Sequence, residues 1–368
     1  MRQLIFGILL VGGICFGSSI SNFMWTRESP GIPISPLVLP SGQTPSSTPA
    51  VFDFALFSNI DIEIKGSSSI WGPVRTSATS EHSVRLGPAD GNRIFGPLTI
   101  GLNGIPNTVV DRPGKVNGGI VPAEDVCSYH SPDYRHFDNL IISGNPTHAN
   151  FNPTIPYTEI SESSYFESFY VTGNIDVLIN TGTQDMIIQT KNFTLSAGHL
   201  ILLGTGRLIL IVQSSFTLSG SSSINNNGKE QNDRPLNSIS DLVSDPNRFI
   251  LYYTGIDQLN LGTGKDRIIG SVMSRSAPIS AGGSSQVFGN IFSDTSGLIN
   301  IFGSVAPNLT GLLYAPNANV KIIGSANIKG SVVAKTIEIG SGTQCGIEYE
   351  FLPFDLPIFI PEANCIIP

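Results

Sequence analysis

Short segments in which apolar and polar residues alternate, each ending at a glycine, recur along the chain. Val320–Ala334 reads VKIIGSANIKGSVVA, and Ile62–Thr76, far earlier in the chain, reads IEIKGSSSIWGPVRT. The two align without a gap, and a looser third copy begins at Ile299. Alternation with a period of two predicts strands with one buried face, and glycine suits the corners between them.

A second repeat has the form glycine, any residue, aliphatic, large apolar, small. It occurs at Gly270–Ser274, Gly289–Ser293, Gly311–Ala315 and Gly330–Ala334, so its glycines are 19, 22 and 19 residues apart. A period of this length is typical of one coil of a solenoid, whose coils bury their apolar side only by stacking. We therefore predict an all-β protein, a right-handed parallel β-helix. A β-sandwich is the alternative, but it gives no reason for copies in register.

The pattern predicts two pieces of β-helix, residues 51–102 and 169–350. Residues 103–168 between them are rich in proline and break the pattern, so we expect an irregular insertion with one short helix near Ser161–Phe169. Residues 351–368 are expected to form a C-terminal cap, because the end of a solenoid otherwise exposes unpaired backbone.

The N-terminus has the pattern of a secretory signal. Arg2 precedes the uncharged apolar run Leu4–Phe16, and small residues follow up to Ser19. Residues 1–19 are therefore predicted to be a signal peptide, with an uncleaved membrane anchor as the alternative. Residues 20–50 contain six prolines and are expected to be an extended linker. In either case the body is expected to be secreted or displayed at the cell surface, with membrane contact only through the N-terminal segment.

Composition narrows the class of partner. Only 13% of residues are charged, the formal net charge is −8, and no block of lysine or arginine occurs. Binding to phosphate backbones needs a basic surface, so nucleic acid is not expected as a partner. Many glycines and prolines with few charges fit an all-β protein with many turns.

Three cysteines follow the signal segment: Cys127, Cys345 and Cys365. Outside the cell, one disulfide and one free thiol is the simplest arrangement. Cys345–Cys365 is the first candidate for that disulfide. Pairing of Cys127 with either of them, or three buried thiols, are the alternatives.

No cofactor is predicted. Cys127, His130 and His136 are metal-ligand residue types close in sequence, but no second pair nearby completes four ligands. They are weak metal candidates, and a solvated loop is the favoured interpretation. The segment Gly262–Lys265 resembles a phosphate-binding loop but has Asp266 where the motif needs serine or threonine, so it is interpreted as a turn.

Some polysaccharide lyases and hydrolases have a parallel β-helix fold, and their activity needs acidic or basic residues clustered on one face. Here the charges are scattered along the sequence. A carbohydrate-active enzyme would require carboxylates such as Asp176, Asp185 and Glu63 to converge within about 10 Å. We instead predict a protein that is not an enzyme.

Four segments carry a resemblance to a known family: Phe54–Ser58, Leu251–Gly255, Leu313–Ala318 and Gly330–Lys335. They are similar to a family of bacterial cell-surface β-helix proteins of uncharacterised function, which are associated with type IV pilus-like (PilX-type) proteins. The N-terminus here lacks the processing pattern of a pilin. The resemblance implies a parallel β-helix behind a signal or anchor, and it implies no catalytic residues.

The expected function is that of a structural or adhesive cell-envelope protein with a pilus association. Its expected partners are other envelope or pilus proteins, a surface polysaccharide, or further copies of itself. A carbohydrate-active enzyme and a self-polymerising scaffold are the alternatives.

Overall fold

The computed structural model describes residues 53–226, 244–303, 308–341 and 343–350, together with 357, 360 and 364–366. All of them belong to one compact unit, Pro40–Pro368. The predicted signal peptide and linker lie outside the described residues. Among the described residues, no helix combines the length and apolar character that a membrane crossing needs.

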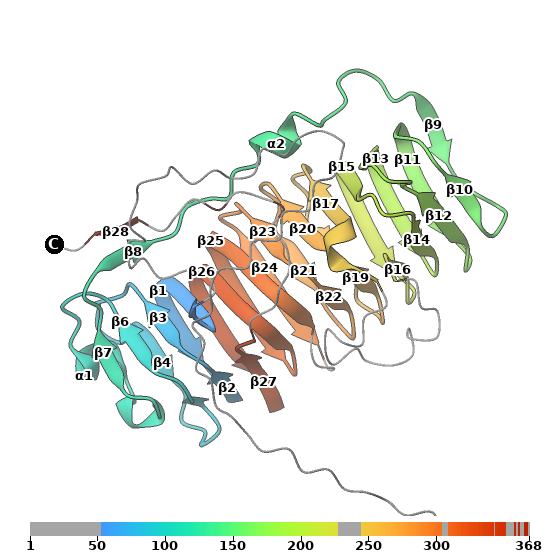
Figure 1. The fold of residues 1–368 in the computed structure, drawn as a ribbon. Coiled ribbons are helices and arrows are strands. Elements are labelled where there is room, and N and C mark those ends of the chain that lie inside the picture. Colours follow the sequence, from blue (N-terminus) through green and yellow to red (C-terminus); the bar gives the residue numbers. More distant parts are fainter. Residues whose placement is uncertain are drawn as a thin grey trace, which may run out of the picture. The chain divides into compact units, whose positions relative to one another are not determined.

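The fold is a parallel β-solenoid of about 12 turns, as the repeats predict (Figure 1). Its first coils contain β1 (Leu56–Ile64), β2 (Ser67–Trp71), β3 (Val74–Thr76), β4 (Val84–Leu86), β5 (Arg93–Ile94), β6 (Leu98–Ile100), α1 (Pro106–Val109), the 3-10 turn Pro113–Lys115 and β7 (Ile120–Pro122). A connecting segment holds β8 (Val126–Ser128) and α2 (Arg135–Asp138).

The remaining coils run from β9 to β27. They contain β9 (His148–Phe151), β10 (Thr158–Ile160), β11 (Ser164–Thr172), β12 (Asp176–Asn180), β13 (Met186–Ser196), β14 (His199–Leu203), β15 (Leu208–Ser219), β16 (Ser223–Ile224), the 3-10 turn Pro246–Arg248, β17 (Phe249–Tyr253), β18 (Leu259–Asn260), β19 (Arg267–Ile269), β20 (Ser271–Ser274), β21 (Ile279–Ala281), β22 (Gln286–Phe288), β23 (Ile291–Ser293), β24 (Leu298–Gly303), β25 (Leu309–Gly324), β26 (Asn327–Ser341) and β27 (Thr343–Glu348). A last strand, β28 (Asn364–Ile366), pairs antiparallel with β8.

Each coil contributes to three sheet faces. The strap face contains β3, β6, β17, β20 and β23, the grid face contains β4, β18, β21 and β24, and the third face contains β5, β12, β14, β19 and β22. Long strands such as β15 turn a corner and serve two faces. Apolar side chains from all three faces fill one continuous core, which includes the stacked rings of Phe169, Phe193 and Phe216.

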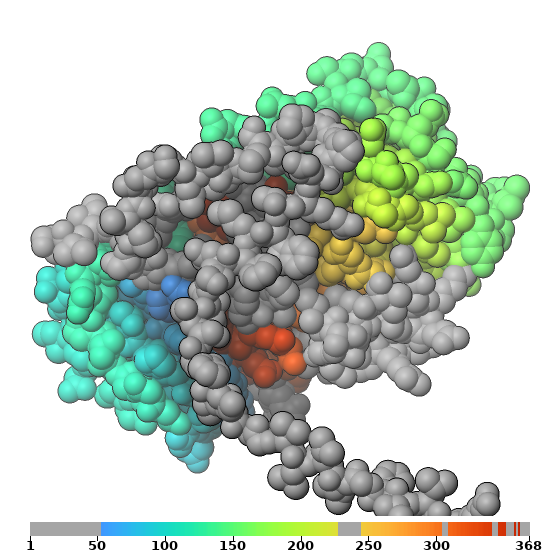
Figure 2. All heavy atoms as spheres, in the orientation of Figure 1, coloured from blue at the N-terminus to red at the C-terminus, as the bar shows by residue number. Residues whose placement is uncertain are grey.

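The coils are not stacked in chain order. β1 pairs in parallel with β26, joining Leu56 to Val332 and Ile62 to Ile337, so the first coil lies on the last one. We call this contact the seam. Figures 1 and 2 show the blue N-terminal coils beside the red C-terminal coils. From the seam the chain builds outward to β7 at one end, crosses to β9 at the other, and returns coil by coil to β27.

The seam explains the sequence copies. Ile62 and Val320 both pair with Ile337, and Ile64 and Ile322 both pair with Ile339. The two copies are thus separated by one coil, and Ile62, Ile64 and Ile322 are fully buried. The prediction that these distant segments form equivalent stacked layers is confirmed.

Residues 123–147, here called the strap, connect the two ends of the stack along the outside of the strap face (Figure 1). They cover a second apolar core, in which Tyr129, Tyr134 and Phe137 pack on outward-facing side chains of the coils. Those coil residues are Phe57, Ile209, Ile211, Ile250, Tyr252, Met273, Phe292, Leu312, Tyr314 and Val333. Tyr252 donates to Asp138 at 2.5 Å, and Tyr314 donates to the His130 carbonyl at 2.7 Å.

Three expectations about local structure differ from the fold. The helix expected near Ser161–Phe169 is wrong, because residues from Ser164 onward form strand β11, in which Phe169 and Val171 point inward on either side of the exposed Tyr170. Only 123–147 of the predicted insertion lies outside the coils, since β7, β9 and β10 complete turns of the solenoid. The last coil has no open end to be capped, because the seam pairs it with the first coil; the predicted cap, residues 351–368, lies mostly outside the described residues, and its strand β28 pairs with β8 of the strap.

Candidate functional site

The outward side of the grid face presents a regular array of uncharged polar side chains. We call its best-ordered part, on strands β11, β13 and β15, the polar grid. It comprises Ser168, Tyr170 and Thr172, then Asn192, Thr194 and Ser196, then Ser215, Thr217 and Ser219. Inward residues between them, such as Phe193 and Leu195, are buried, so alternation directs these nine side chains outward.

Strand pairing places the nine residues in rows and columns. Ser168 pairs with Asn192 and Asn192 with Ser215, while Thr194 pairs with both Tyr170 and Thr217. Neighbouring strands are about 4.8 Å apart, and alternate residues along a strand are about 6.6 Å apart. The array therefore has two fixed repeats that follow directly from the backbone.

Hydrogen bonds between coils hold the outer columns in place. The Ser215 hydroxyl donates to the Asn192 side-chain oxygen at 2.9 Å, and Ser219 donates to the Ser196 hydroxyl at 3.2 Å. At the edge of the stack, Ser168 donates to Asn150 at 2.9 Å. These lateral bonds restrict the rotamers and leave the central column, Tyr170, Thr194 and Thr217, facing outward.

The most solvent-exposed side chains of the grid belong to the central column and to the neighbouring column of Asn192. Tyr170 is 44% exposed, and Thr217 and Asn192 are also exposed. The nearest charges, Lys191 and Glu167, form an ion pair of 2.8 Å at the corner of the grid. Its hydrogen bond to Glu167 raises the pKa of Lys191, so the amine stays charged and paired at neutral pH.

Toward the seam, the outward side chains of the grid face change from uncharged to charged. The central column continues through Asn260, Ser280 and Asn300, and then becomes charged at Lys321 and Glu338. The seam carries a ladder of ion pairs: Arg85–Glu63, Glu63–Lys65, Lys65–Glu338 and Glu338–Lys321. The charges on this face thus stabilise the join between coils, whereas the grid carries none.

The predicted metal candidates are not brought together as ligands. Cys127 is disulfide-bonded, which removes the thiolate that a metal would need, and its sulfur accepts a hydrogen bond from Arg75 at 3.1 Å. His130 and His136 lie on the strap with exposed side chains. Within the described part of the chain, no three residues of metal-ligand type cluster.

The first disulfide candidate, Cys345–Cys365, is wrong. Cys345 is a free thiol that points into the core, where its sulfur donates to the Ile322 carbonyl at 3.1 Å and burial raises its pKa to about 11. Cys365 lies in β28, directly opposite Cys127 in the pairing with β8. Cys127, on the strap, is therefore the cysteine that forms a disulfide, in agreement with the alternative in which Cys127 is one of the paired cysteines.

The carboxylates named for an enzyme do not converge. Asp176 is buried on the third face, Asp185 forms an ion pair with Arg207, and Glu63 belongs to the seam. Eight strand-to-strand steps separate the coil of Asp176 from that of Glu63. At about 4.8 Å per step, the two lie about 38 Å apart along the stack, well beyond the range in which carboxylates act as a pair.

Neither the polar grid nor the covered strap face was predicted from the sequence. Serine, threonine and asparagine are spread through the strand segments, and their rows become visible only when the coils are aligned in register. A signal for the strap face does exist: FILYY at Phe249–Tyr253 is apolar at every position. A strand covered on both sides has continuous apolar residues, whereas a strand covered on one side alternates.

Comparison with known proteins gives little beyond the fold. No curated protein matches the sequence. Among solved structures, the chain is similar to an antifreeze protein, the ice-binding protein LeIBP from an Arctic yeast, at 8% identity over 83% of this chain and 94% of that chain, with a TM-score of 0.21. A TM-score this low supports no inference about a ligand. Residues 290–351, which include β23 to β27, match a family model described as a domain of unknown function (DUF7305).

Proposed function

We propose that this chain is a non-enzymatic adhesive protein of the bacterial cell surface, and that the polar grid is its contact surface. One observation carries the proposal: the strap face is covered from β15 to β1, while the polar grid presents an ordered, uncharged array to solvent. Bacterial origin and pilus association rest on the sequence resemblance alone.

Rigidity supports an adhesive role. Every coil is held to its neighbours by parallel backbone pairing, the interior is one apolar core, and the strap adds a second core outside. A binding surface on such a scaffold keeps its spacing without ordering loops on contact, so little conformational entropy is lost on binding. The proline-rich residues 20–50 would hold the solenoid away from the cell.

Cell fractionation and N-terminal sequencing test this proposal. We expect the protein in the secreted or surface fraction, with residue 20 as its first residue if the signal is cleaved. Cells lacking the protein should adhere less to a target surface, and the added purified protein should compete with adhesion of normal cells. Protein confined to the cytosol with residues 1–19 intact would contradict the proposal.

A further inference from the structure

The polar grid has a chemistry and a spacing that select a class of ligand. It offers hydroxyl and amide groups with no ionised side chain, so it has nothing to attract a polyanion or a polycation. Hydroxyls are also cheaper to desolvate than charges, which favours contact with another uncharged surface. The partner implied by this chemistry is neutral and rich in hydroxyl groups.

The repeat of the grid identifies the partner further. Its rows are about 4.8 Å apart because amide groups of adjacent strands hydrogen-bond to one another. Sugar chains that carry N-acetyl groups and pack through amide-to-amide hydrogen bonds share this repeat for the same reason. A chain lying along each coil would meet the same column of side chains in every row.

The exposed tyrosine adds an aromatic surface on which a sugar ring can pack. Tyr170 lies in the central column with Thr194, and the residue is 44% exposed although the strand needs no aromatic residue at an outward position. An aromatic ring next to hydroxyl groups suits a sugar, which has one apolar C–H face and a polar rim.

We infer that the polar grid binds an ordered, neutral, N-acetylated polysaccharide, with neighbouring sugar chains lying over neighbouring coils. This inference rests on the proposed adhesive function and names its ligand class. Thr194 and Thr217 supply hydrogen-bonding hydroxyls in the central column of the grid, and Tyr170 supplies the ring at the other end of that column.

Sedimentation of the purified protein with crystalline chitin tests the inference. Thr217→Lys places a charge and a long side chain in the central column of the grid, and the bound fraction should fall at least about tenfold, because an interface that buries an unpaired charge loses 1.4 kcal/mol or more. Thr205→Lys is the matched control, since Thr205 is an exposed threonine of the same coil outside the grid face. Its binding should stay within about twofold of the parent protein.

Two further variants separate binding from folding. Thr217→Val keeps the shape of the side chain and removes the hydroxyl, and Tyr170→Ala removes the ring; each should weaken binding with an unchanged melting temperature. Cellulose, which is neutral but lacks the amide, and deacetylated chitosan should both bind less than chitin.

Several outcomes would overturn the inference. These are no binding of the parent protein to chitin, equal loss in Thr217→Lys and Thr205→Lys, cellulose binding as strong as chitin binding, or a depressed freezing point that shows ice to be the ordered lattice recognised. If surface display and adhesion persist in any of these cases, the proposed function stands and only the ligand is wrong. If the protein is cytosolic, the proposed function fails whatever the chitin result.

Discussion

At the scale of single residues, one column of glycines fixes how closely the coils stack. Gly270, Gly289, Gly311 and Gly330 occupy equivalent corners with φ between 135° and 153°. A Cβ on Gly311 would lie 1.9 Å from the carbonyl oxygen of Gly289 in the next coil. The repeat is therefore a backbone requirement, which is why it was visible in the sequence.

Gly311→Ala is expected to destabilise the protein by about 3 kcal/mol or more, because it combines an unfavourable φ with a collision that only a backbone shift relieves. Urea denaturation measures the change. Gly114→Ala is the control, since nothing lies within 4 Å of its Cβ, and it should be neutral or slightly stabilising. Equal stability of the two variants would contradict the close-stacking argument.

The disulfide pairing of the cysteines could not be predicted from their local sequence. Sequence spacing favoured Cys345 and Cys365, which lie near each other in the chain. Cys345 points inward within a coil, as does Ile347 two residues later, so it faces the core. Pairing between cysteines depends on where the tail crosses the strap, and no local pattern encodes that position.

At the scale of elements, the strap is held mainly by its apolar side chains. Phe137 is 2% exposed and packs on Tyr252, while Arg275 and Tyr252 both donate to Asp138. Burial raises the pKa of the nearby Tyr129 to about 12, so this phenol stays neutral at physiological pH. The strap is thus part of the folded core and connects two ends of the stack that the sequence alone did not relate.

Phe137→Ala should therefore cost about 3 to 5 kcal/mol, the usual effect of removing a buried phenylalanine. Hydrogen exchange should show faster exchange of strap amides than of coil amides, since the coils keep their own ladders. Ile155→Ala, at a residue that is 70% exposed, is the control and should change stability by less than about 0.5 kcal/mol. Uniform loss of protection in all coils would show that the strap is not a separate layer.

The ion pairs at the seam are expected to make the stability of the protein depend on pH. Burial raises the pKa of Glu338, but hydrogen bonds from Lys321 and Lys65 lower it by more, and the net direction is downward. A carboxyl with a lowered folded-state pKa stabilises the protein above its unfolded pKa, and this contribution is lost as the pH falls through the folded-state value. Glu338 should thus stabilise the seam at pH 7 and cease to do so in strong acid.

Glu338→Gln is expected to lower stability at pH 7 by about 0.5 to 1 kcal/mol, a modest effect because its lysine partners are partly exposed. The difference from the parent protein should shrink as the pH falls below the ordinary carboxyl range and vanish in strong acid. Glu81→Gln, at an exposed residue outside the seam, should show no such difference at either pH. A Glu338→Gln effect that persists in acid would exclude the charge as its cause.

At the scale of the whole molecule, the order of coils was only partly predictable. Matching copies showed that Ile64 and Ile322 occupy equivalent layers, which the pairing confirms. The sequence did not show that the first described coil lies inside the stack, because pairing between distant coils is decided by the whole fold. Contacts such as Leu56 with Val332 close a very long loop, so the seam adds strongly to the non-local contacts that slow folding.

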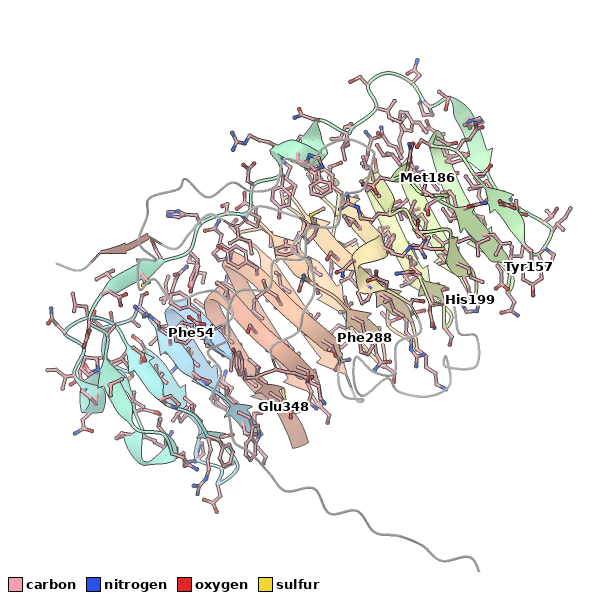
Figure 3. The ribbon with its side chains drawn as sticks, viewed as in Figure 1. Phe54, Tyr157, Met186, His199, Phe288 and Glu348 are labelled. Carbon is pink, nitrogen blue, oxygen red and sulfur yellow. The ribbon has the colours of Figure 1, made fainter. Side chains whose placement is uncertain are left out.

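The ends of the stack bear on the alternative of a self-polymerising scaffold. Among the described strands, β7 pairs only with β6 and β9 pairs only with β11, so each has one free edge. The coil that ends at β7 contains Pro106, Pro113 and Pro122, and the segment from β9 to β10 with its approach contains Pro146, Pro153 and Pro156. Tyr157 projects at this second end (Figure 3). Proline lacks the amide hydrogen that an added strand would need, so both ends resist extension.

We therefore expect a monomer by static light scattering, with a mass that stays constant as concentration rises. Replacing Pro146, Pro153 and Pro156 together by threonine restores three amide donors and should make the measured mass increase with concentration. Pro278→Thr, in the middle of the stack, is the control and should remain monomeric. Association of the parent protein that increases with concentration would show that the prolines do not block the ends. It would also favour the self-polymerising scaffold over the adhesive protein, because the edges of the end coils, rather than the polar grid, would then form the main contact surface.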